Sequence, residues 1–165
     1  MKKQGFTLIE LMVVIVIMGI LAAVAVPKLF GMIAKSKASE VPTAAGTYIN
    51  MMDAFAVEKG GLGTWEEIGY SGPGDKKSAS GASGSYVSNN FIYTEGSVSD
   101  FQATANTKLN DCAKGTLGWK LTPAFIGAGA NQGNVNYTVN SGVTETACKA
   151  LTPAFDGLAR TLASS

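Results

Sequence analysis

The chain has 165 residues, and its 13 lysines and arginines nearly balance its 12 aspartates and glutamates, which gives no indication of a polyanionic partner such as nucleic acid. It contains no histidine, so Ser-His and Cys-His catalytic pairs, and with them the commonest general base and metal ligand, are excluded. Because no phosphate-binding glycine loop occurs either, we expect a chain that is not an enzyme and that binds no cofactor.

The first segment is a short basic leader followed by an apolar run that contains one acid, Glu10. The sixteen residues from Leu11 to Val26 include ten Leu, Ile or Val and no polar side chain. Ten such residues favour membrane insertion by about 0.3 to 0.6 kcal/mol each, which outweighs the cost of about 3 kcal/mol for one carboxylate. Residues 6–26 would span about 30 Å as a helix, the thickness of a bilayer core. The sequence therefore predicts a transmembrane helix over residues 6–26.

An ionisable side chain inside a membrane helix is rare and usually functional, so Glu10 needs a partner. A cut between Gly5 and Phe6 would create one, because it would leave a new amino group one helical turn from Glu10. The segment from Gly5 to Leu11 reads Gly-Phe-Thr-Leu-Ile-Glu-Leu, and it resembles the processing motif of type IV prepilins and the related pseudopilins.

The resemblance implies that a prepilin peptidase cleaves after Gly5 and methylates Phe6 to N-methylphenylalanine. In such pilins the glutamate at the position of Glu10 pairs with the Phe6 ammonium of a neighbouring subunit, so the expected product is a helical filament of this chain. Expected partners are the pilus assembly platform and its ATPase machinery. Before assembly the chain would lie in the inner membrane as a single-pass protein with a periplasmic head, and after assembly in an extracellular fibre.

Two other interpretations of the first segment remain open. Ala23-Val24-Ala25 resembles the cleavage site of an ordinary secretory signal. Alternatively, the helix is a single-pass anchor for a periplasmic binding domain, and Glu10 is incidental. Neither alternative explains the joint occurrence of Gly5, Phe6 and Glu10 at these spacings.

The helix is predicted to continue beyond the membrane to residue 59, where Lys59-Gly60-Gly61 provides a stop signal. Apolar residues recur there at helical spacing and predict one buried stripe. Pro27 and Pro42 should each bend the helix, because proline lacks an amide hydrogen and its ring collides with the carbonyl group four residues earlier. In pilins a segment such as Gly19–Pro27 can lose helicity in the filament, which makes Gly19 and Pro27 candidate assembly residues. The predicted stripe comprises Val41, Ala45, Tyr48, Met52 and Phe55.

Residues 60–165 are rich in Gly, Ser, Thr and Asn and are enough for one small domain. The stretch from Ser71 to Ser85 has low complexity and is predicted to be a mobile surface loop. Its Lys76 and Lys77 are too few to indicate nucleic-acid binding. Alternating or aromatic-rich segments predict three to four antiparallel strands. They lie at residues 86–94, 101–109, 117–122 and 135–139.

The expected architecture is α+β, and it matches the ladle-shaped pilin fold. A leader (residues 1–5) precedes a helical spine (6–59) and a globular head (60–165).

In the head the heptapeptide that begins at Leu121 returns at Leu151 with one change. We interpret each copy as a Thr-Pro turn with its Phe packed into the head.

Cys112 and Cys148 are the only cysteines, and in an exported head they most simply pair as one disulfide. A zinc site is the weaker alternative, because two thiolates without a histidine or a second close pair lack the usual ligand spacing.

The resemblance implies a structural subunit of a type IV pilus, which would serve surface adhesion, twitching motility or DNA uptake. The alternative is a pseudopilin of a type II secretion system. Major pseudopilins usually carry a calcium site of acidic residues near the carboxy terminus, and here only Asp156 follows Cys148.

Overall fold

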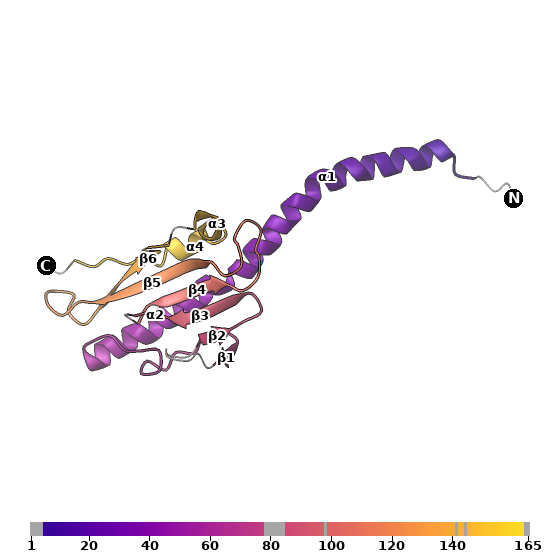
Figure 1. Cartoon of the computed structure of the whole chain (residues 1–165). Coiled ribbons are helices and arrows are strands. Elements are labelled where there is room, and N and C mark those ends of the chain that lie inside the picture. Colours follow the sequence, from indigo (N-terminus) through magenta and orange to yellow (C-terminus); the bar gives the residue numbers. More distant parts are fainter. Residues whose placement is uncertain (1–4, 78–84, 98, 141, 144, 164–165) are drawn as a thin grey trace.

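The computed structural model describes residues 5–77, 85–97, 99–140, 142–143 and 145–163. A long bent helical spine carries a six-stranded sheet on its carboxy-terminal half, and its amino-terminal half projects away from the head (Figure 1). The spine consists of α1 (Leu8–Ala38) and α2 (Glu40–Lys59). The architecture is α+β, as the sequence predicts.

The spine is interrupted at Ser39, three residues before Pro42. This agrees with the bend predicted at Pro42, whose ring crowds the carbonyl group of Ala38. The Ser39 side chain donates a hydrogen bond to the Ser36 carbonyl oxygen (2.7 Å), so the break is stabilised within the chain. Pro27, by contrast, lies inside the continuous helix α1.

The sheet has six antiparallel strands in sequence order, which corrects the predicted number of three to four. The segment predicted at residues 86–94 divides between β2 and β3, and β1 lies in the stretch predicted to be a loop. Both additional strands have only three residues, too few for an alternating pattern to be recognised. Residues 71–74 of that loop are irregular, and residues 78–84 lie outside the described part of the chain. The strands are β1 (Asp75–Lys77), β2 (Ser85–Val87), β3 (Phe91–Glu95), β4 (Phe101–Ala105), β5 (Leu117–Phe125) and β6 (Val135–Val139).

The core lies between α2 and the inner face of the sheet. Of the predicted stripe on α2, all residues except Phe55 are fully buried, and Phe55 is half-buried. Tyr48 forms an aromatic cluster with Trp65, Tyr70 and Phe101, with ring centroids 5.6 to 6.4 Å apart. Aromatic pairs at such distances add stabilisation beyond that of the buried area.

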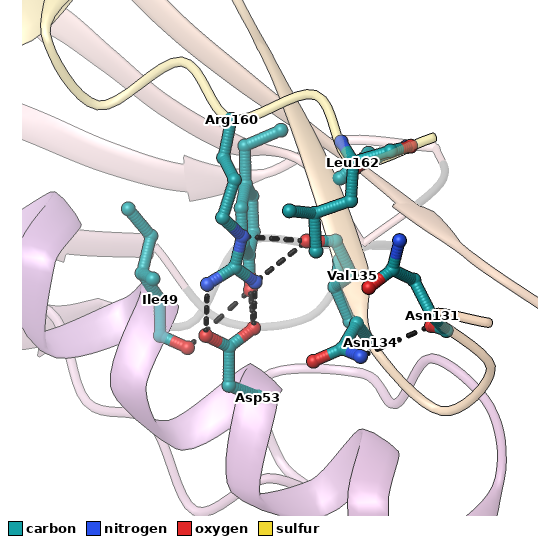
Figure 2. A network of polar contacts seen from close by, with 9 residues as sticks. Ile49, Asp53, Asn131, Asn134, Val135, Arg160 and Leu162 are labelled. Carbon is teal, nitrogen blue, oxygen red and sulfur yellow. Dashed lines mark hydrogen bonds and ion pairs between the residues drawn. The ribbon is translucent and has the colours of Figure 1, made fainter. Parts of the chain in front are cut away.

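The carboxy-terminal segment is tied to both β6 and α2 (Figure 2). Backbone hydrogen bonds join Arg160 and Tyr137 in both directions. The Arg160 guanidinium forms two bonds to the Asp53 carboxylate (2.6 and 2.8 Å) and two more to the Val135 carbonyl oxygen. The Tyr137 hydroxyl also donates to Asp53 (2.8 Å). Through these bonds a residue near the end of the chain fixes the sheet to the spine.

Cys112 and Cys148 form the predicted disulfide. It joins the connection between β4 and β5 to the short helix α3 (Thr146–Lys149). Gly118 of β5 lies directly beneath it, and a Cβ atom at this position would approach the Cys148 Cβ to 2.7 Å. A side chain is therefore excluded at residue 118.

The two copies of the repeated heptapeptide adopt different structures. The copy at Leu121 lies in β5, where Pro123 pairs with Tyr137, so the predicted turn is wrong there. The copy at Leu151 does form the start of a short helix, α4 (Pro153–Asp156), and its Phe155 is fully buried.

We expect the disulfide to contribute much of the stability of the head. Replacing both Cys112 and Cys148 with Ser should lower the free energy of unfolding by about 3 to 4 kcal/mol, because the unfolded chain gains the entropy of an open loop. Urea unfolding of the full chain in detergent, followed by tryptophan fluorescence, measures this change. A reductant should destabilise the wild type and leave the double variant unchanged. Equal stability of the two proteins would contradict the prediction.

The tyrosines of the core make stability sensitive to alkali. Burial is the main cause that raises the pKa values of Tyr48, Tyr70, Tyr93 and Tyr137 above the ordinary value of 10.0. Because the folded-state pKa is raised, folding favours the neutral form of each phenol. The contribution of these tyrosines to the free energy of unfolding is therefore complete below pH 10 and is lost as the pH rises further. In an alkaline titration, most tyrosinate absorbance should appear together with the loss of circular dichroism. Titration of these four tyrosines near pH 10 in a folded chain would contradict the prediction.

Candidate assembly site on the amino-terminal helix

Helix α1 begins with a reciprocal cap formed by Thr7 and Glu10. One oxygen of the Glu10 carboxylate, Oε2, accepts hydrogen bonds from the Thr7 amide (2.8 Å) and the Thr7 hydroxyl (2.5 Å). In return, the Thr7 hydroxyl accepts a bond from the Glu10 amide (3.4 Å). This is the capping box of Thr-x-x-Glu sequences. The acid that stands out in the sequence is thus bound within its own chain.

The second oxygen of Glu10, Oε1, accepts no hydrogen bond from any residue that the structure describes. The side chain is exposed to solvent in the single chain, so this oxygen can accept a further donor. Arginine, lysine or an ammonium group would form the strongest such bond, because charge-assisted hydrogen bonds to carboxylates are short and strong.

The predicted cleavage position is accessible. Gly5 and Phe6 precede the helix in irregular backbone, and the Phe6 side chain is 86% exposed. No described atom lies within 4 Å of a Cβ placed at Gly5. Packing within the described part of the chain therefore gives no reason for a glycine at residue 5.

The structure brings Gly5, Phe6 and Glu10 together at the start of α1, whereas Gly19 and Pro27 lie farther along the same helix. Both are exposed, and a Cβ at Gly19 would also meet no described atom. At 1.5 Å per residue, Gly19 is about 14 Å from Glu10 and Pro27 about 26 Å from it. The five candidates are therefore spread along the helix and around it rather than gathered in a compact site.

The surface of α1 between these residues is apolar and uncovered. Large hydrophobic side chains are exposed on every side of the helix, and only Ala34 and Ala38 are buried. By length and composition alone, the spine (Leu8–Lys59) could cross a membrane, and none of its most apolar window is covered by the rest of the chain. An uncovered apolar surface of this size needs either lipid or protein around it.

Sequence analysis singled out Glu10 but missed Thr7. The signal was present, because Ser or Thr followed three residues later by Glu marks a helix start.

No group of three or more His, Cys, Asp or Glu side chains within the described ranges is placed to hold a metal ion. The arrangement can bind an amine and bury apolar surface.

Comparison with known proteins gives matches in both halves of the chain. Residues 1–26 match the family model described as the prokaryotic N-terminal methylation motif. The chain is 34% identical over 142 residues to a fimbrial protein of Eikenella corrodens, a match that covers 84% of this chain and 83% of the relative.

Two further relatives are major pilins. The chain is 32% identical to a type IV major pilin protein of Neisseria gonorrhoeae over 145 residues, 88% of this chain and 78% of the relative. A type IV major pilin protein of Myxococcus xanthus is 45% identical over 58 residues, 35% of this chain and 26% of the relative. No solved structure gives a significant match. Because two of these relatives align over most of their length, the chain belongs to the type IV pilin family, whose members are structural subunits rather than enzymes.

Proposed function

We propose that this chain is cleaved between Gly5 and Phe6, methylated on the new amino group, and assembled into the shaft of a type IV pilus through its amino-terminal helix. The fibre would serve adhesion, twitching motility or DNA uptake. A prepilin peptidase would act on the chain while α1 lies in the inner membrane and the head lies in the periplasm. An assembly platform with its ATPase would then move α1 from lipid into the fibre.

The uncovered apolar surface of α1 is the observation that carries this proposal. The head has a closed core in which aromatic side chains such as Trp119, Tyr93 and Phe101 are fully buried, so it does not need the amino-terminal half of the spine for its own stability. Exposed apolar area of this extent costs about 25 cal/mol per Å² in water. Lipid removes that cost before assembly, and the same helices of neighbouring copies would remove it afterwards.

Glu10 would set the register between copies. Cleavage after Gly5 leaves a cationic amino group on Phe6, and the Oε1 atom of Glu10 has no described partner. In the apolar interior of a fibre an unpaired carboxylate is costly, and a charge partner offsets much of that cost. The neighbouring ammonium would therefore be bound while the Thr7 cap holds the other oxygen in place.

The segment from Gly19 to Pro27 would adapt the helix to the fibre. Pro27 cannot donate a backbone hydrogen bond to Ala23, so the helix is held there by one bond fewer. Gly19 adds the low helix propensity of glycine. We propose that this part of α1 can extend when the chain leaves the bilayer.

Mass spectrometry of fibres sheared from cells tests the processing step. The mature chain should begin at residue 6 and carry one methyl group on its terminal nitrogen, and residues 1–5 should be absent. The amino-terminal peptide identifies both changes in one measurement. Fibres built from chains that retain residues 1–5 would contradict the proposal.

Replacing Glu10 with Ala should leave membrane insertion and leader cleavage intact and strongly reduce fibre assembly. Loss of one partner from a buried ion pair costs about 3 to 5 kcal/mol, and the loss would recur at every subunit contact. Electron microscopy and immunoblots of sheared fibres measure the effect. The control is Glu66→Ala, which removes one negative charge at an exposed position of the head. Equal fibre yields from both variants would disprove the role of Glu10.

A further inference from the structure

A hollow lies where α1 meets the head, and the function proposed above does not use it. It opens between the end of α1 and the connection that joins β4 to β5, and its volume is about 410 Å³. Its apolar side consists of Phe30, Ile33, Ala34 and Leu109, and its polar side consists of Lys37, Lys108 and Asn110. The hollow is thus amphiphilic, with an apolar wall beside two ammonium groups.

The two lysines are available to a ligand. Both side chains are exposed, and neither forms an ion pair with any residue that the structure describes. Asp111, the acid nearest to Lys108 in sequence, is also exposed and is not paired with it. Other exposed lysines are near them in the sequence. Lys28 and Lys35 precede Lys37 on α1, and Lys114 follows Lys108 in the connection between β4 and β5.

The wall that carries Lys108 is held in place by the fold. Leu109 and Cys112 exchange two backbone hydrogen bonds of 3.0 Å each, and Cys112 is joined by the disulfide to α3. Leu109 is buried, which fixes the segment against the core. The hollow is therefore largely formed before a ligand arrives, and this lowers the entropy cost of binding.

The apolar surface of the predicted membrane helix continues into this hollow. Beyond Val26 the exposed fractions of Leu29, Phe30 and Met32 are 55%, 62% and 61%. Lys28 is the only charge in this stretch, and a lysine stem can reach from such a position to the membrane surface. Residues 11–34 span about 36 Å, a length that a bilayer accommodates by helix tilt. The hollow would then lie at the level of the lipid headgroups.

We propose that before assembly the hollow binds an anionic phospholipid, with its phosphate between Lys37 and Lys108 and an acyl chain along Phe30 and Ile33. This rests on the proposed function, because it requires α1 to lie in a bilayer. Side chains of a helix lean toward its amino terminus, so Lys37 leans toward the membrane. Neighbouring lysines would add attraction to an anionic surface. The lipid would leave when another copy covers α1.

The test uses the unassembled full chain in nanodiscs of equal parts phosphatidylcholine and phosphatidylglycerol. Native mass spectrometry after release counts the lipids of each kind that stay bound. Wild type should retain phosphatidylglycerol preferentially, and Lys37→Gln/Lys108→Gln should reduce that preference by roughly 25-fold, as expected for two lysines at an anionic surface. Lys37→Arg/Lys108→Arg should preserve it. The matched control is Lys76→Gln/Lys77→Gln, which removes the same charge from exposed positions of β1.

The proposal is overturned if wild type and Lys37→Gln/Lys108→Gln retain the same proportion of phosphatidylglycerol. If the variant with unchanged lipid retention also forms fewer fibres on cells, the hollow would be assigned instead to an acidic surface of a second copy. The lipid count uses unassembled protein, so failure of this inference is distinct from failure of the proposed fibre, which the Glu10 and mass-spectrometric experiments test.

Discussion

The structure depends on one helical spine that meets two different environments. From residue 41 onward its apolar stripe is covered by the sheet, and Tyr48 and Met52 are completely buried. Toward the amino terminus the spine has no cover from the rest of the chain. Because Ala34 and Ala38 are the buried residues of α1, the rest of its apolar surface is available for intermolecular contact. A globular domain can thus fold independently of the partner that later surrounds its helix.

The carboxylates of the spine show how one helix separates these roles. Glu40 accepts a hydrogen bond from the Tyr93 hydroxyl (2.9 Å), and Asp53 binds Arg160 and Tyr137, so both acids fasten the head to the helix. Glu10 has only its own cap, and one of its oxygens has no described partner. Both oxygens of Asp53 accept hydrogen bonds from the head and Tyr93 holds Glu40 against the sheet, whereas Glu10 makes no contact with the head and lies exposed in the apolar half. That difference explains why Glu10 is the candidate for a contact with another copy.

The spine and β6 could be predicted from the sequence, because 3.6-residue and alternating periodicities are strong local signals. The short strands β1 and β2 could not, since three residues show no period. Identical Leu-Thr-Pro-Ala-Phe segments become a strand at Leu121 and a helix start at Leu151, so tertiary contacts override local preference there. The pairing of Asp53 with Arg160 joins residues 107 apart, and no local pattern identifies it. Thr7 was predictable from the capping-box spacing and was missed.

The interruption at Ser39 has a mechanical consequence. It is the single break between α1 and α2, and from it α1 extends over 31 residues, or about 46 Å. A rotation of about 5° at this joint would displace the far end of α1 by roughly 4 Å. Small changes in a few backbone dihedral angles would therefore produce much larger displacements at the amino-terminal end of α1. In a stack of such subunits, bending at this joint would let the fibre extend under tension, with Ala34 and Ala38 as the buried side chains of α1 that must shift.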